Sequence, residues 1–293
     1  MTIAAQPRAP EDQAAALSLP DTDVGMLTCV FAIQDAGGSL PAACAGYEGG
    51  SDLYQLSLAG GAGLRALAQQ VPVADFGEEA LRERLADPAH LEIVARTHDA
   101  LVTAAAVGGA VVPLPLATLF TDRARALATL SARAGQFRVL LDRLRGNAEW
   151  AVKVYMTQGA TGPDAPDAPD ERDRSGSESM QSAHGAGRAY LDRVRARRQR
   201  RQDRQAAAVA EAARIDETLA SLAKDAAHRR LHGTQVTGRH RSQILNGAYL
   251  VDVRRAEQLR DAVAGLRARA DLVEIEVSGP WVPYSFVQWD ADQ

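Results

Sequence analysis

The chain has 293 residues, of which 46% are hydrophobic and 24% are charged, and its formal net charge is −4. This length and composition suffice for two domains with cores of their own and exclude a disordered chain. The two cysteines, Cys29 and Cys44, form neither a CxxC pair nor a metal-ligand spacing. They argue against a disulfide-rich secreted scaffold and indicate a reducing cytosol.

The beginning of the chain predicts a flexible leader over residues 1–23, because this stretch has acids and prolines but no secretion-signal pattern. An N-terminal α+β domain is expected over residues 24–122. A near-continuous apolar run predicts a buried strand at 24–34, and a second strand follows at 53–58. The glycines of residues 60–66 superficially match a dinucleotide-binding fingerprint, but the helix and the acid that this motif requires are missing. We interpret the run as a tight turn into a short helix.

Helical patterns and a proline-containing strand complete this domain. A short helix is expected at 78–86, and Asp87-Pro88 begins a second one that carries His98 on its apolar face. That position favours a core histidine over a catalytic one. The uncharged run 101–121 is too rich in alanine, glycine and proline for a membrane span. It predicts a helix end, a Gly-Gly stop and a strand at 110–120 whose two prolines indicate an edge or a bulge.

The second domain is expected over residues 123–287, with a tail at 288–293. It opens with one amphipathic helix that ends at Gly146. The segments that follow are a strand at 149–155, a disordered acidic linker at 157–185, a long helix at 186–231, a strand at 242–252, a helix at 254–270 and a strand at 272–278. This β-α-β-α-β series favours a ferredoxin-like fold, although a fourth strand is not evident. The fold class is therefore α+β, with a long helical excursion from the second domain.

The long helix has apolar positions at both ends, including Leu191 and Val194, but its middle is polar, so we expect packing at each end. Residues 188–204 hold eight arginines and two aspartates. Such a cluster can neutralise phosphates, so a nucleic-acid-binding protein is an alternative function. The stretch lacks interleaved aromatic residues and a DNA-reading motif. A solvated helix face, or a contact with an acidic partner or the acidic linker, explains it as well.

Other chemical motifs are weak. His228, His232 and His240 include a pair four residues apart, but no carboxylate or cysteine is spaced to complete a metal site. The sequence contains no recognisable nucleophile–base pair, phosphate-binding loop or paired carboxylates. We therefore expect no enzyme, no cofactor and no metal.

The end of the second domain concentrates the aromatic residues of an aromatic-poor chain. After the alternating strand, Gly279-Pro280 is expected to end the ladder, because proline has no N–H to donate. Trp281, Tyr284 and Phe286 follow within six residues. One interpretation is a lid that closes the core of the domain. The other is a partner-binding patch, because aromatic residues rimmed by polar groups make good anchors.

Four sequence blocks resemble the GvpF/GvpL family of gas vesicle proteins. They are the run VVPLPLATLF at 111–120, EWAVKVY at 149–155, NGAYLVD at 246–252 and GPWVPYSF at 279–286. The last block is the most specific. The chain departs from the family pattern at Pro115, where the family often has arginine, and at Val282, which replaces a proline.

The resemblance implies an accessory protein of gas vesicle formation, a minor vesicle-associated component in the cytoplasm. It also implies contact with the small hydrophobic shell protein and other gas vesicle accessory proteins, and two α+β domains, the second related to the ferredoxin-like fold. Neither a nucleic acid nor a membrane is an expected partner, and the oligomeric state stays open. Trp281, Tyr284 and Phe286 are the candidate partner-binding residues.

Overall fold

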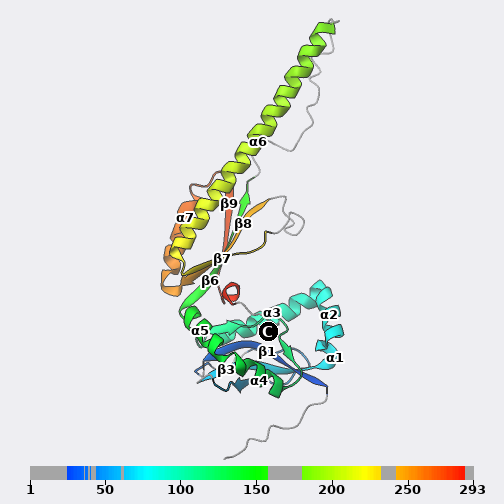
Figure 1. The fold of residues 1–293 in the computed structure, drawn as a ribbon, viewed down its shortest axis with the longest axis vertical. Coiled ribbons are helices and arrows are strands. Elements are labelled where there is room, and N and C mark those ends of the chain that lie inside the picture. The colour runs from blue at the N-terminus through cyan, green and yellow to red at the C-terminus, as the bar shows by residue number, and fades with distance from the viewer. Residues whose placement is uncertain are drawn as a thin grey trace, which may run out of the picture.

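The structure, a computed structural model, describes residues 25–287 except 36, 39, 41–43, 61–62, 158–179 and 232–241. It contains two antiparallel sheets, one in each half of the chain, and a long helix that projects from the second half (Figure 1). The α+β class is therefore confirmed. The predicted leader, most of the predicted acidic linker and the tail lie outside the described residues.

The first sheet is built around β1 (Met26–Asp35), whose residues are almost all buried. Its order is β2 (Tyr54–Ser57), β3 (Leu64–Pro72), β1 and β4 (Val111–Pro113). The short strand β5 (Leu119–Phe120) also pairs with β1, at residues 28–29, whereas β4 pairs at residues 32–34. The short helix expected after residue 60 is wrong, because Leu64 already begins a strand. Gly60 and Gly63 adopt positive φ angles of 71° and 80°, which close a hairpin between β2 and β3.

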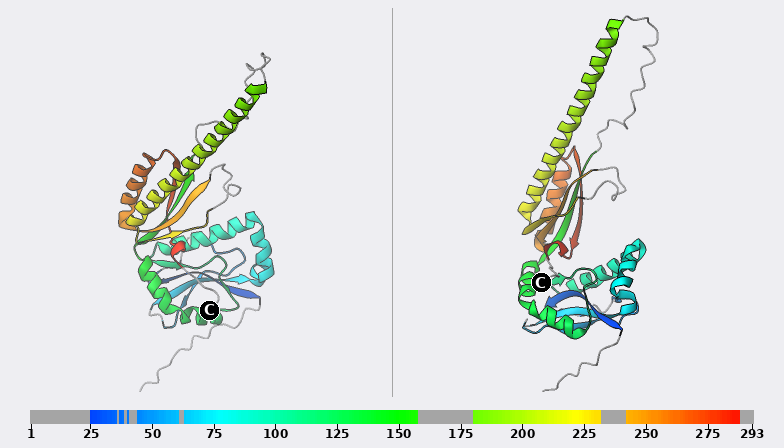
Figure 2. Two further views of the ribbon diagram at one scale, coloured as in Figure 1. Left: turned by 45° about the horizontal axis from the view of Figure 1, so that its top comes forward. Right: turned by 45° about the vertical axis from the view of Figure 1, so that its right-hand side comes forward.

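Helices cover both faces of this sheet. The helices α1 (Val73–Phe76), α2 (Glu78–Ala86) and α3 (Pro88–Ala106) lie along one side, and α3 buries its apolar stripe against β1. The opposite face is covered by α4 (Arg123–Ala132) and α5 (Ala134–Leu144) (Figures 1 and 2). A single helix was expected there, but the backbone leaves the helical conformation at Arg133. The strand expected at 110–120 is likewise divided, by a turn in which Ala117 has a φ of 59°.

The packing of α4 and α5 bears on the domain boundary. Both helices bury apolar residues against β1, β3 and β4, including Leu130 and Phe137. The sequence placed the boundary at residue 122, before these helices. We propose that it lies after them, near Gly146, because their apolar faces complete the core of the first sheet.

The second sheet has the order β7 (Asp225–His228), β8 (Gln243–Asp252), β6 (Asn147–Met156) and β9 (Val273–Trp281). The helices α6 (Met180–Leu222) and α7 (Ala256–Arg267) pack on one face of it. This βαββαβ connection with β6 and β8 in the centre is the arrangement of the ferredoxin-like fold.

The fourth strand, β7, lies inside the segment that the sequence assigned to the long helix. The helix expected to reach residue 231 ends at Leu222. The chain then pairs with β8, and the N–H groups of Lys224 and Arg229 at the two ends of β7 donate to the carbonyls of Leu250 and Asn246 at 2.7 and 2.8 Å. An alanine-rich tetrapeptide has little strand propensity of its own, so this strand depends on its partner.

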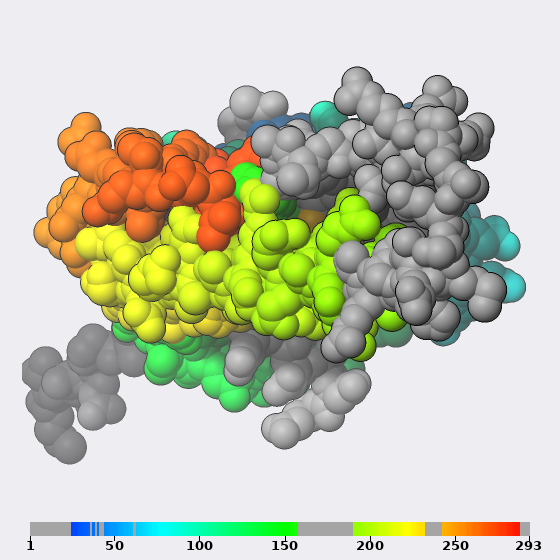
Figure 3. All heavy atoms as spheres, turned by 90° about the horizontal axis from the view of Figure 1, so that it is seen from above, coloured from blue at the N-terminus to red at the C-terminus, as the bar shows by residue number. Residues whose placement is uncertain are grey.

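Among the side chains of α6 that the structure describes, those of the C-terminal part pack against the sheet. Its buried positions are Ala208, Ala212, Ile215 and Leu219, and from Tyr190 to Ala207 the side chains are exposed apart from the partly buried Arg204. Figure 1 shows this exposed part extending away from both sheets, and Figure 3 shows α6 beside α7 from above. The packing expected at the first end of the helix is absent from the described residues, since Leu191 and Val194 are exposed.

Candidate interaction surface at the C-terminal segment

The C-terminal segment, which we define as residues 281–287, lies between the two sheets (Figure 2). It follows β9, which pairs with β6 as far as Trp281 despite the cis Gly279–Pro280 peptide bond and a register shift beside it. The expected end of the ladder at this proline is therefore wrong. Gly279 has a φ of 136°, and a Cβ there would lie 2.8 Å from the carbonyl oxygen of Glu149, so the close approach to β6 requires glycine.

A buried carboxylate holds this segment in place. The Glu149 side chain, on β6, is only 3% exposed. Its oxygens accept hydrogen bonds from the backbone N–H of Ser285 at 2.8 Å and from the Ser285 hydroxyl at 3.1 Å. Arg229, just after β7, pairs with the same carboxylate, and its Nε donates to the Ser285 hydroxyl at 2.8 Å. Burial of the charge is thus compensated by an opposite charge and by hydrogen bonds.

Tyr284 packs toward the first sheet. Its ring lies 6.3 Å from that of His98 on α3, centroid to centroid, and burial raises the pKa of its hydroxyl above the usual range. His98 is itself buried, with Nε2 3.1 Å from the carbonyl oxygen of Leu114. The prediction of a core histidine is confirmed.

The buried position of His98 makes stability depend on pH. Burial lowers the pKa of His98 below its usual 6.5, so the unfolded chain takes up a proton near this pH that the folded chain resists. We expect stability to fall as the pH decreases below about 6.5. Thermal denaturation at pH 7.5 and pH 5 checks this. His98→Gln should show a smaller difference between the two pH values, and an unchanged difference would contradict the assignment.

Phe286 joins the cores of the two halves. Its side chain is 4% exposed, and the cluster that encloses it includes Leu141 from α5 and Leu250 from β8. The sequence proposed Phe286 as a partner-binding residue. A partner cannot reach this ring while the segment stays folded, so its contacts are internal.

Trp281 is the accessible member of the three candidates. It is 50% exposed, and its indole N–H donates to the Ser278 hydroxyl at 3.3 Å. The structure thus brings all three aromatic residues into one segment but divides their surroundings: Phe286 is buried, Tyr284 is half-buried and Trp281 faces solvent. Sequence reasoning missed Glu149, Arg229 and Ser285, because no motif or spacing in the sequence marks these three residues as neighbours.

The structure also places the remaining candidates. His228 lies 2.8 Å from one carboxylate oxygen of Asp216 on α6, and the Tyr249 hydroxyl donates to the other at 2.5 Å. His232 and His240 lie outside the described residues. Within the part of the chain that the structure describes, no group of three or more His, Cys, Asp or Glu side chains could hold a metal ion. No helix there has the length and apolar content needed to cross a bilayer.

The fold defines a class of α+β proteins in which two antiparallel sheets are joined by a C-terminal segment packed between them. A family model described as gas vesicle synthesis protein GvpL/GvpF matches residues 28–288. The chain belongs to this family, as the four sequence blocks predicted. The family consists of gas vesicle proteins and is not a known enzyme family.

Individual relatives agree with this assignment. The chain is 35% identical over 223 residues to gas vesicle protein L of Streptomyces sp. (strain CB03234), which covers 76% of this chain and 79% of that protein. The crystal structure of GvpF from Anabaena sp. PCC7120 matches with a TM-score of 0.59 and 15% identity, over 90% of this chain and 97% of that one. GvpF from Microcystis aeruginosa matches with a TM-score of 0.50 and 14% identity, over 90% and 99% of the two chains. These two structures establish the fold alone.

Proposed function

We propose that this protein is an accessory factor of gas vesicle formation that binds the small hydrophobic shell protein and assists its assembly into the vesicle wall. Membership of the gas vesicle family supports the process, and the curated relative is itself named gas vesicle protein L. A shell subunit with an apolar face must be kept from aggregating before it joins the wall. Association with the vesicle in the cytoplasm, as a minor component, follows from this role.

The proposed contact with the shell protein rests on one observation: Trp281, at the end of β9, is half-exposed. A tryptophan that offers an apolar ring and an N–H donor is the residue type most enriched at the energetic centre of protein interfaces. Tyr284 and Phe286 serve in this proposal as supports, since their rings fix the segment that presents Trp281. The buried Glu149 carboxylate has the same supporting role.

We expect Trp281→Ala to weaken binding of the shell protein by about tenfold or more, the usual cost of removing an interface tryptophan. The measurement is co-purification of the shell protein with the tagged protein, followed by titration of the isolated pair. Tyr190→Ala is the matched control, because Tyr190 is also an exposed aromatic residue but lies on the projecting part of α6. Full binding by a folded Trp281→Ala variant would refute the contact.

The alternative of nucleic-acid binding depends on α6 alone. The arginines between residues 190 and 204 lie on a helix whose side chains are mostly exposed. Single-stranded nucleic acids are usually held by aromatic side chains that stack on bases, and this stretch has only Tyr190. The exposed arginines fit an acidic protein surface equally well. We therefore prefer the assembly role.

A further inference from the structure

The part of α6 that projects beyond the second sheet concentrates positive charge. Between residues 190 and 204 it carries seven arginines and two aspartates, whereas the whole chain has a net charge of −4. Six of these arginines are exposed, and Arg204 is partly buried, one turn before the buried Ala208. Like charges four residues apart destabilise a helix, so this distribution opposes helix formation. The arginines therefore need an explanation other than the stability of α6.

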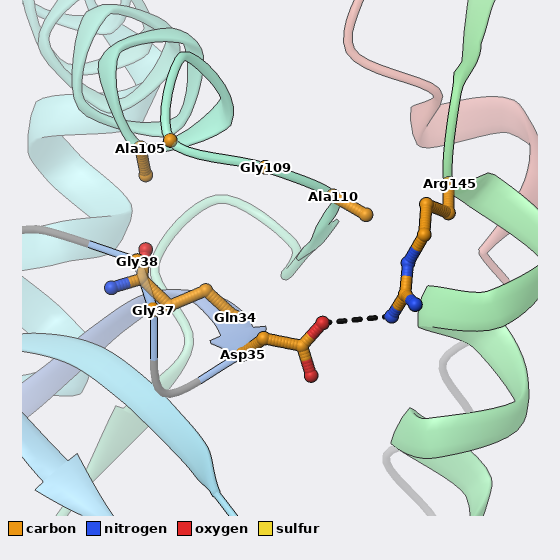
Figure 4. A pocket seen from close by; sticks show the side chains of 9 residues that line it. Gln34, Asp35, Gly37, Gly38, Ala105, Gly109, Ala110 and Arg145 are labelled. Carbon is orange, nitrogen blue, oxygen red and sulfur yellow. Dashed lines mark hydrogen bonds and ion pairs between the residues drawn. The ribbon is translucent and has the colours of Figure 1, made fainter.

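An arginine elsewhere in the molecule shows what a structural role looks like. The guanidinium of Arg145 lies 2.8 Å from the carboxylate of Asp35, beside the cavity drawn in Figure 4, and joins the end of α5 to the end of β1. By contrast, no carboxylate in the described part of the chain lies within ion-pair distance of Arg198 or Arg201 on α6. These two side chains are exposed and tie no elements together.

Arg198 and Arg201 continue the stripe with which α6 packs on the second sheet. The packed part of the stripe consists of apolar residues at alternating spacings of three and four: Ala208, Ala212, Ile215 and Leu219. The same spacing toward the start of the helix gives Gln205, Arg201, Arg198, Val194 and Leu191. This second part, which we call the exposed stripe, lies beyond the sheet (Figure 1). A stripe of this period is the surface along which a second helix packs.

The chemistry of the exposed stripe defines the partner. Leu191 and Val194 are 53% and 44% exposed and offer apolar surface, whereas Arg198 and Arg201 offer guanidinium groups, which prefer carboxylates. A nucleic acid would pair with the arginines but leave the apolar residues in water. A membrane would require an apolar face along the whole helix. A second copy of this chain, aligned on the same stripe, would place arginines opposite arginines.

We propose that the exposed stripe binds an acidic amphipathic helix of a partner protein. Carboxylates of the partner pair with Arg198 and Arg201, and its apolar residues cover Leu191 and Val194. The geometry is that of a two-stranded coiled coil, in which charged positions determine the choice of partner. The acidity of this partner distinguishes it from the hydrophobic shell protein, so the inference is independent of the proposed contact at Trp281.

Fluorescence anisotropy of a labelled peptide, titrated with the full chain, tests the proposal. The probe is a helix-forming peptide of three Glu-Leu-Glu-Ala-Leu-Glu-Ala repeats, and the control peptide has glutamine in place of every glutamate. We expect the acidic peptide to bind about tenfold more tightly than the control, and this difference to shrink as salt is added. Equal binding of the two peptides, or no binding, would overturn the proposal.

Two further outcomes of this titration would identify a different occupant. An oligothymidylate of equal charge that binds as tightly as the acidic peptide would favour a nucleic acid and refute the proposal. Peptide binding that appears only after the acids of residues 164–178 are replaced by their amides would assign the arginines to the acidic stretch of this same chain. That result would also count against a partner protein.

Two double variants separate the exposed stripe from the charge of the helix as a whole. Arg198→Gln/Arg201→Gln removes two charges from the stripe and should weaken binding of the acidic peptide about tenfold. Arg195→Gln/Arg200→Gln removes two charges from other faces of the same helix and should weaken it about threefold or less. All four side chains are exposed, so the Tm should stay unchanged in both variants. Equal losses of binding would show that charge alone holds the peptide and would refute the site.

Discussion

Phe286→Ala is expected to lower the free energy of unfolding by about 3–5 kcal/mol, the usual cost of removing a buried phenylalanine ring. The ring is 4% exposed and contacts a core to which both sheets contribute. Its loss leaves a cavity between the two halves of the molecule. The C-terminal segment should therefore detach more readily, in addition to the loss of overall stability.

Urea denaturation followed by far-UV circular dichroism measures the loss of stability, and hydrogen exchange of the Ser285 amide, which donates to Glu149, reports on the segment itself. Trp281→Ala serves as the control for stability, because half of that side chain is already in solvent. Its free energy of unfolding should change far less. Equal effects of the two substitutions would mean that the segment is not the junction between the sheets.

Glu149→Ala is the second large effect. The free energy of unfolding is expected to fall by about 1–3 kcal/mol, because the part-buried Ser285 N–H loses its acceptor, whereas the Arg229 side chain is 40% exposed and can be hydrated. The substitution removes the acceptor of the Ser285 N–H and one acceptor of the Arg229 guanidinium, which keeps its hydrogen bond to the Ser285 hydroxyl. Glu149→Gln should lose less, since an amide oxygen still accepts one of these bonds. The same denaturation experiment measures both variants.

The matched control for Glu149 is Glu78→Ala, which removes an ion pair with Arg82 on the surface of α2. Exposed pairs of this kind contribute little to stability, so the variant should resemble the unchanged protein. A loss in Glu149→Ala no larger than that in Glu78→Ala would show that the Glu149 carboxylate does not hold the C-terminal segment in place. Such a result would also mean that Glu149 does not position Trp281 for binding a partner.

Much of the fold follows from local periodicity. The helix predicted at 78–86 is observed with the same bounds, and the strands β6 and β8 were predicted to within two residues at each end. These segments agree with their sequence because burial on one or both faces selects the residue types directly. The strands β3 and β7 were missed because the alanines of β7, and the leucine, alanine and glutamine residues of β3, favour helix in isolation. Pairing with neighbouring strands overrides that preference.

The residues of the candidate site were harder to predict from the sequence than the helices and strands. Glu149 alternates with Trp150 along β6, a pattern that predicts a solvent-facing acid, and it is buried only because a segment more than 130 residues later folds over it. The density of aromatics after β9 was visible, but which ring faces water depends on the first sheet.

The projecting part of α6 has a consequence for how the molecule moves in solution. The 18 residues 190–207 form a helix about 27 Å long. This helix makes the molecule longer but adds little to its volume. The particle therefore experiences more friction than a sphere of equal mass and elutes early from a sizing column. Elution volume alone would report too large an assembly, so the number of copies is properly determined from scattered light, which measures mass irrespective of shape.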